Sequence, residues 1–354
     1  MRPVCVETAD AGEVALAAPR PLSGEVVDPI ALEPVDSLEI TVLTDNSYDA
    51  LLADSAVATR ARLGAAPRVE AGQFTDGLGL TGLLAEHGFA AVVRVTRGGR
   101  THTLLFDTGI SPDGMALNGR RLGVDPTDFA AVVLSHGHGD HTGGFPGLDR
   151  WLGRTSMPLV LHPAAWSPRR LVPPGAPPFA MPVLSRRSLA DGGFEIVERR
   201  EPSLLLDGCV LVTGEVDRTT EFETGMPRHE ALVDGVWRPD PWIVDDQALV
   251  VRVRDRGLVV LTGCGHAGAV NIVRHALRLT GEDRLHALIG GLHLTGPGFE
   301  TIIEPTARAL SELAPDVVVP AHCTGWKAQM RLAADLPEAF TPGAAGSRYR
   351  FAAA

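Results

Sequence analysis

The feature that most constrains this chain is a group of metal-ligating side chains directly after an apolar stretch. Residues 130–134 have the composition of a buried strand, and His136, His138, Asp140 and His141 follow, with glycines between the first three. If the two leading histidines continue the strand, they project from the same face. The glycines let the backbone turn tightly and bring the carboxylate and the last histidine to the same point. This pattern favours a fold in which a strand ends beside a metal site.

The residue types indicate which metal such a site would prefer. Imidazole and carboxylate are ligands of zinc, and iron and manganese also use them. A polar loop whose histidines only form hydrogen bonds is the alternative, but it would gather many titratable groups at a cost in desolvation and charge repulsion. We therefore expect zinc, as one or two ions, with manganese or iron as further candidates.

Histidines also follow other predicted strands. His266 and Cys264 come after the apolar stretch 258–261, in the same arrangement as the first motif, and His322 comes after another such strand. We expect these three residues to ligate metal, with a structural turn or a core histidine as the alternatives. A thiolate beside a divalent cation would be deprotonated readily. His293 also ends a strand and is expected to face the substrate or to support a ligand.

Two acidic residues have other candidate roles. Asp107 ends the strand predicted at 103–106 and is expected to accept a hydrogen bond from the ring N–H of a metal ligand, with an Asx turn as the alternative. Glu215 is a further candidate metal ligand, although an ordinary ion pair with Arg218 is the alternative. The histidines without supporting context are expected to be structural or exposed: His102, His162, His229, His275 and His286.

Composition excludes several classes of partner. The formal net charge is -11, and the 32 Lys and Arg residues are scattered, which argues against nucleic acid and anionic membranes as partners. Apolar stretches of the length that spans a membrane and a signal-peptide pattern are absent, so we expect a cytoplasmic protein. The four cysteines have no CxxC spacing and do not indicate a disulfide framework. The sequence does not indicate an oligomeric state.

The order of the predicted elements indicates the domain organisation. Residues 1–36 lack clean periodicity and are expected to form an extension, mobile or packed over a single domain at 37–354. Strands are predicted at 38–43, 90–95 and 103–106, the last two joined by a Gly-Gly turn. Later, a helix is predicted at 302–313, before the buried strand at 317–319. The succession of strand clusters with interleaved helices predicts two β-layers covered by helices.

These residues carry a family resemblance. The HxHxDH pattern, followed by Thr142-Gly143-Gly144 after an apolar strand, resembles the signature of the metallo-β-lactamase superfamily. The supporting segments are Thr44-Asp45-Asn46, Ala85-Glu86-His87-Gly88, Leu105-Phe106-Asp107-Thr108-Gly109, Thr262-Gly263-Cys264-Gly265-His266, Gly290-Gly291-Leu292-His293-Leu294 and Pro320-Ala321-His322-Cys323-Thr324-Gly325. Together they resemble the branch that contains the dihydropterin ribofuranosylaminobenzene-phosphate synthases and many bacterial hydrolases.

The resemblance implies an αββα sandwich with the metal site at one edge of the two sheets. One ion would be held by His136 and His138 with a further ligand, and a second by Asp140 and His141, with a later carboxylate or thiolate shared between them. His322 matches the late histidine of the superfamily. The resemblance also implies that Glu86 and His87, otherwise ordinary surface residues, line the site.

This chain departs from the commoner superfamily pattern at two places. Where many members have a histidine followed by glycine, it has Thr213-Gly214-Glu215-Val216, and where they have a bridging aspartate, it has the segment around Cys264. The sequence therefore does not identify the third ligand of each ion, and a site with one ion rather than two is also compatible with it.

The leading functional hypothesis is a metal-dependent hydrolase. A metal-bound hydroxide would attack a phosphoester or an ester-like carbonyl, with Asp140 orienting it, and the substrate would be a small molecule of anionic character. A synthase that displaces pyrophosphate by an aryl amine is the alternative that the resemblance implies. An iron redox protein and a non-enzymatic metal-binding protein are alternatives of another class. Specificity is expected from the irregular segments 47–84, 165–182 and 218–245.

Overall fold

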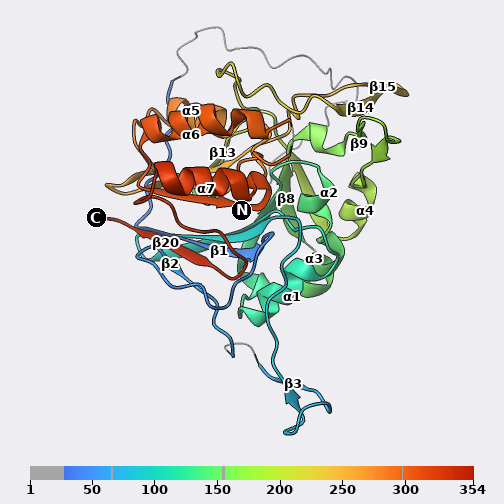
Figure 1. Cartoon of the computed structure of the whole chain (residues 1–354), viewed down its shortest axis with the longest axis vertical. Helices are drawn as coiled ribbons and strands as arrows, with labels where there is room; N and C mark the ends of the chain where they lie inside the picture. Colours follow the sequence, from blue (N-terminus) through green and yellow to red (C-terminus); the bar gives the residue numbers. More distant parts are fainter. Residues whose placement is uncertain (1–27, 65–66, 154–155, 297) are drawn as a thin grey trace.

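Two large β-sheets pack face to face, and helices cover the outer face of each (Figure 1). The computed structural model describes residues 28–64, 67–153, 156–296 and 298–354. The order of layers is helix, sheet, sheet, helix, which confirms the predicted αββα sandwich.

The first sheet has eight strands. In spatial order they are β11 (Phe194–Glu198), β8 (Met157–Leu161), β7 (Phe129–Val133), β6 (Arg100–Phe106), β5 (Ala90–Arg97), β1 (Ser37–Thr44), β20 (Arg348–Ala352) and β2 (Ala58–Thr59). β6, β7, β8 and β11 are parallel to one another, and β1, β5 and β6 form antiparallel pairs. The strands predicted at 38–43, 90–95 and 103–106 are therefore confirmed as β1, β5 and β6.

The second sheet has six strands. They are β12 (Ser203–Leu205), β13 (Val210–Val212), β16 (Leu249–Val253), β17 (Gly257–Thr262), β18 (Leu285–Gly291) and β19 (Val317–Ala321), in spatial order. β17, β18 and β19 are parallel, so their carboxyl ends lie at one edge of the sheet. A four-stranded sheet contains β10 (Phe179–Ala180), β9 (Arg169–Leu171), β14 (His229–Val233) and β15 (Val236–Pro239). A small hairpin of β3 (Val69–Glu70) and β4 (Leu78–Gly79) projects from the body, as the label of β3 shows in Figure 1.

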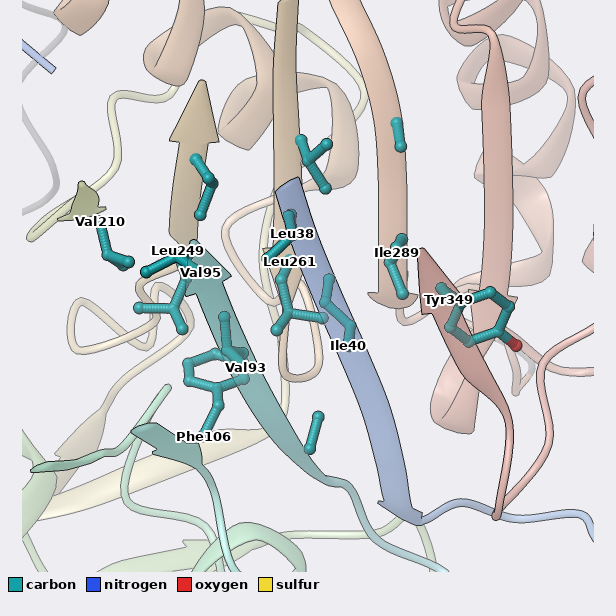
Figure 2. Close-up of a cluster of buried hydrophobic side chains, with 14 of the residues drawn as sticks. Leu38, Ile40, Val93, Val95, Phe106, Val210, Leu249, Leu261, Ile289 and Tyr349 are labelled. Atoms are coloured by element: carbon teal, nitrogen blue, oxygen red, sulfur yellow. The ribbon is translucent and has the colours of Figure 1, made fainter. Parts of the chain in front are cut away.

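The alternation of side chains along the strands explains how both faces of a sheet are buried. In β17, Val259 and Leu261 point into the layer between the sheets, whereas Leu258 and Val260 point to the helices. Figure 2 shows the layer between the sheets, where Leu38 and other first-sheet residues meet the side chains of the second sheet. Apolar strands of this kind read as continuous hydrophobic runs, as they do in the sequence.

Helices complete the two outer layers. The first sheet is covered by α1 (Gly114–Arg121), α3 (Phe145–Leu152) and α4 (Arg186–Asp191), and the second by α5 (Ala269–Thr280), α6 (Ile303–Leu313) and α7 (Trp326–Asp335). In α5, Val270, Val273 and Ala276 recur every three residues and bury one face against the sheet. The helix ends at Gly281, whose φ of 68° is left-handed. The helix predicted at 302–313 is confirmed as α6.

Shorter elements connect these layers. They are α2 (Gly139–Thr142), η1 (Pro126–Asp128), η2 (Pro163–Trp166), η3 (Glu300–Ile302) and η4 (His322–Thr324). Of the predicted N-terminal extension, residues 1–27 lie outside the described residues. The remainder packs on the second sheet, because Val35 is fully buried and forms a bridge with Val253. Among the described helices, none has both the length and the apolar character needed to cross a membrane.

Candidate metal centre

Three histidines converge where β7 and β17 end. The Nε2 atom of His136 and the Nδ1 atom of His138 each lie 3.1 Å from Nε2 of His266. All three side chains are buried, and burial, followed by neighbouring cationic groups, holds their pKa values well below the usual value for histidine. The rings are therefore neutral near pH 7 and can present lone pairs to a cation. This set supplies three nitrogen ligands for a first ion.

A second set lies beside the first. The Oδ2 atom of Asp140 lies 3.3 Å from Nε2 of His322 and 3.7 Å from Nε2 of His141. Burial alone would raise the pKa of Asp140, but His141 and His322 hold it below its usual range. Burial alone would likewise lower the pKa of His141, but the carboxylates of Asp140 and Asp107 raise it to about 9. The carboxylate of Asp140 thus lies close to both imidazoles, and the ligand atoms of Asp140, His322 and His87 all lie within 4.8 Å of one another.

Cys264 lies between the two sets. Its Sγ atom and the ligand atoms of His136 and His141 all lie within 4.8 Å of one another. The same sulfur lies 2.9 Å from Sγ of Cys323 and 3.2 Å from Nδ1 of His293. Burial raises the pKa of the Cys264 thiol in the absence of a cation, and a bound dication would reverse that shift. Deprotonated in that way, Cys264 could serve as a ligand shared by two ions.

Hydrogen bonds to the far side of the rings of His136, His141 and His322 fix the orientation of these candidate ligands. Oδ2 of Asp107 lies 2.7 Å from Nδ1 of His141 and accepts a second bond from the Ser135 hydroxyl. That hydroxyl also lies 2.9 Å from Nδ1 of His136. In the same way, Oδ1 of Asn46 lies 2.9 Å from Nδ1 of His322. Each ring with Nδ1–H bonded in this way directs Nε2 into the centre, the usual arrangement around metal-bound histidines. Asp107 is thus placed to accept a hydrogen bond from the ring N–H of His141.

The backbone at three strand exits is left-handed. Asp107, His293 and His322 have φ angles of 59°, 45° and 47°. Such angles are uncommon outside glycine and cost of order 1–3 kcal/mol each, so the surrounding contacts must hold them. For His322, one such contact is the hydrogen bond from its backbone N–H to Oδ1 of Asp45, at 2.8 Å. The angle turns the histidine away from the strand direction, toward the centre.

The donor atoms fit divalent cations. Among the buried side chains of the described residues, Nε2 of His141 and Nε2 of His322, both close to Oδ2 of Asp140, have no hydrogen-bond partner. Leaving buried polar atoms unpaired costs about 1–3 kcal/mol each, a cost that metal coordination removes for those nitrogens that face the ion. Imidazole, carboxylate and thiolate together form a set that suits zinc.

The remaining predicted site residues lie at different distances from the centre. His293 contacts Cys264 and lines the cavity beside the centre, and His87 Nε2 lies 3.5 Å from Asp140 Oδ2. Glu86 instead accepts hydrogen bonds from the backbone N–H groups of Ile110 and Ser111. It therefore holds the neighbouring loop rather than contributing to the ligand sets.

Glu215 lies away from the ligand sets. Its Oε1 atom is 3.1 Å from Nε2 of His162 and 3.1 Å from Nη1 of Arg200. The predicted ion pair with Arg218 is wrong, because that guanidinium instead donates to the backbone carbonyl of His266. This contact depends on where the segment after β17 lies in the fold. The spacing of three residues between Glu215 and Arg218 does not show it. His266 therefore occupies the place in the first set that the segment around Glu215 left open.

Two residues of this region were not predicted from the sequence: Cys323, whose Sγ atom lies within 4.8 Å of the ligand atoms of Cys264 and His322, and His229, which was expected to be structural or exposed. His229 begins β14, is 2% exposed, and its ring centroid lies 4.9 Å from that of His138. Neither ring nitrogen has a hydrogen-bond partner, and the side chain lines the cavity beside the centre. No signal in the sequence distinguishes it, because β14 belongs to the four-stranded sheet and carries no motif.

A buried ion-pair network supports the loop between His136 and His138. Oδ2 of Asp245 accepts a hydrogen bond from the backbone N–H of Gly137 at 2.8 Å. Arg169 donates two bonds to Asp245 and a third to Asp240, and all three side chains are at most 3% exposed. The network ties the four-stranded sheet to the metal-binding loop.

The buried carboxyl of Asp246 makes stability depend on pH. Burial, the largest influence, raises its pKa to about 7, and its Oδ2 atom accepts a hydrogen bond from the Ala267 N–H. An unfolded aspartate has a pKa of about 3.9, so the folded chain retains a proton that the unfolded chain releases. The free energy of unfolding therefore falls as pH rises from about 4 to 7.

We expect metal-free wild type to lose on the order of 2 kcal/mol through Asp246 between pH 5 and pH 8. In Asp246→Asn, which keeps an acceptor for Ala267, this loss disappears. Urea denaturation of both proteins at the two pH values measures the difference. The same pH dependence in wild type and variant would contradict the assignment.

The chain is similar to several known proteins. The sequence profile of the metallo-beta-lactamase superfamily matches residues 85–276. A protein of Methanocaldococcus jannaschii named 7,8-dihydropterin-6-methyl-4-(beta-D-ribofuranosyl)-aminobenzene-5'-phosphate synthase is 27% identical over 280 residues, which are 75% of this chain and 90% of that protein. An uncharacterised protein of the same organism is 28% identical over 256 residues, 70% of this chain and 88% of that protein. A solved metal-dependent hydrolase of the beta-lactamase superfamily superposes with a TM-score of 0.65 at 25% identity, covering 89% of this chain and 99% of that one.

Proposed function

The chain belongs to the metallo-beta-lactamase superfamily, and from this premise we propose that it is a metal-dependent hydrolase acting on an ester-like or phosphoester small molecule. The observation that carries the proposal is the pair of ligand sets joined by Cys264, which opens onto a cavity lined by Asp140, His138 and His266. A structural metal site would instead be closed by protein ligands. We propose two zinc ions, one for each set.

Each side chain of the centre has a definite task in this proposal. The ions, when bound, supply Lewis acidity and lower the pKa of water toward about 7. Asp140, whose pKa is held low by His141 and His322, stays ionised and can orient the attacking water by accepting a hydrogen bond. Asp107 and Asn46 keep the Nδ1 atoms of His141 and His322 engaged, so that each Nε2 faces the centre.

A synthase is the second candidate. It is supported by the similarity to the protein of Methanocaldococcus jannaschii that is named a synthase. In that reaction, as proposed for this chain, an aryl amine would displace pyrophosphate. The two candidates differ in what the centre must activate, which is water in the first and an amine substrate in the second.

Elemental analysis together with turnover tests the hydrolase proposal. Purified wild type is expected to contain about two zinc ions per chain, one bound by each ligand set. It is also expected to cleave a chromogenic ester or phosphodiester. His138→Ala should lose about one of these ions together with turnover, because a ligand of the first set is removed. If wild type neither contains metal nor takes it up on titration, the proposal is wrong. If metal is present and neither substrate class is cleaved, the synthase candidate gains.

A further inference from the structure

A large apolar cavity opens directly onto the metal centre. Its volume is about 820 Å³, which is within the range of small-molecule sites. The centre contributes His138, Asp140, Cys264 and His266 to one end of it. The remaining wall is mainly apolar and includes Leu171, Phe179, Met181, Val183, Leu184 and Phe194. These residues come from the four-stranded sheet, the segment after β10 and the edge strand β11 of the first sheet.

The wall of this cavity offers little to a charged substrate. Among the described residues that line it, none is Lys or Arg, and Asp149 is the acidic group outside the metal centre. Substrates with several phosphate groups are normally held by arginine, lysine or other N–H donors. A polyphosphate extending from the centre would instead meet mainly apolar side chains, a few hydroxyls and a carboxylate, at a desolvation cost that no cationic side chain of this wall offsets.

The rim of the cavity exposes apolar side chains to solvent. Phe179 is 62% exposed and Val183 is 44% exposed. Such residues are placed to cover an apolar group, because each methylene removed from water contributes about 0.8 kcal/mol. At the inner end, His229 has two buried ring nitrogens without partners. A polar atom of a substrate close to the reacting bond would satisfy one of them.

We propose that the substrate is a carboxylic ester or lactone whose acyl part is a large, uncharged, apolar group held in this cavity. The inference rests on the proposed hydrolase function and narrows it. In the reaction one water is consumed: the bond between the acyl carbon and the ester oxygen breaks, the water oxygen bonds to that carbon, and the leaving oxygen takes a proton. The products are a carboxylic acid and an alcohol, which remain in one molecule when a lactone is opened.

A series of p-nitrophenyl esters tests the preference for an apolar acyl group. From acetate to octanoate, kcat/KM of the zinc-loaded protein is expected to rise about fourfold for each added methylene. The phosphodiester bis-p-nitrophenyl phosphate should be the poorer substrate. Ester cleavage without dependence on acyl length, or a preference for the phosphodiester, would overturn this inference and leave the hydrolase proposal standing. No cleavage of any substrate would count against the hydrolase proposal itself.

A matched pair of variants locates the effect in the cavity. Val183→Arg places a cation on the cavity rim, and Val236→Arg makes the same change at a position in β15 that is 55% exposed and does not line the cavity. We expect Val183→Arg to lower kcat/KM for the octanoate at least tenfold, whereas Val236→Arg behaves as wild type. Phe179→Arg, on the same rim, serves as a second variant. Equal effects of Val183→Arg and Val236→Arg would overturn the inference.

Binding of a neutral apolar dye gives a readout that does not depend on turnover. N-phenyl-1-naphthylamine is expected to bind metal-free wild type with an increase in fluorescence, and its Kd should rise about tenfold in Val183→Arg but not in Val236→Arg. The octanamide analogue of the octanoate ester, in which an amide replaces the scissile ester bond, should displace the dye. Dye binding that is the same in all three proteins would place the apolar site elsewhere and contradict the inference.

Discussion

Replacing His266 by alanine is expected to release about one metal ion per chain and to lower kcat/KM at least a hundredfold. His266 is the residue that brings the first ligand set to three nitrogens, since His136 and His138 each lie 3.1 Å from its Nε2 atom. Losing a group that only supports a ligand costs about 10–100-fold in metal affinity or activity, so losing a ligand itself should cost more. Elemental analysis and steady-state kinetics of the purified variant measure both effects.

Glu215→Gln is the control for this prediction. It changes the segment in which many superfamily members would place the third ligand, but Glu215 contacts His162 and Arg200 rather than the centre. We expect its metal content to equal that of wild type. Normal metal content in His266→Ala, or loss of metal in Glu215→Gln, would refute the assignment of the first ligand set.

Replacing Arg169 by methionine is expected to lower the free energy of unfolding by about 3–5 kcal/mol. The guanidinium bonds to Asp245 and Asp240, and its removal leaves two buried carboxylates without their cation. Burial alone would lower the pKa of Arg169, but Asp245, followed by Asp240, raises it above its usual range. The two carboxylates therefore stabilise the charged form of the guanidinium. Because Asp245 also holds the N–H of Gly137, we expect weaker metal binding as well.

The neighbouring Arg170 provides a matched control. It pairs with Glu230 and lies over the ring of Trp237, but both partners of the ion pair are 26% exposed. Exposed pairs contribute up to about 1 kcal/mol, so Arg170→Met should cost no more than that. Chemical denaturation of the metal-free proteins compares the two variants. Similar losses in both would mean that the buried network contributes no more than a surface pair.

The sequence predicted the fold and the core of the candidate centre because both depend on local patterns. Apolar runs such as 258–261 predict buried strands, and the carboxyl ends of parallel strands in one sheet must share an edge. His266 and His322 were expected as metal ligands because each follows such a strand, and the structure places them in two neighbouring groups of ligand atoms. Asp107 was found in the same way, since it ends the strand beside β7.

Only the tertiary structure decided which side chains contact one another around the centre. Sequence spacing suggested Arg218 as the partner of Glu215, yet Arg218 bonds to the backbone of His266. His229 lies on a strand of the four-stranded sheet and gave no signal, although its ring contacts that of His138. These contacts join segments far apart in the chain.

The sequence by itself thus determined the layered fold, the strand-end position of the centre and most of its candidate ligands, because alternation and strand polarity are properties of short segments. The tertiary structure alone decided that Cys264 lies between the two ligand sets and that an apolar cavity adjoins them. The walls of that cavity come from the four-stranded sheet, α4 and β11, whose residues show no common pattern in the sequence. These residues come together because whole elements pack against one another, and the spacing of residues along the chain does not show that packing.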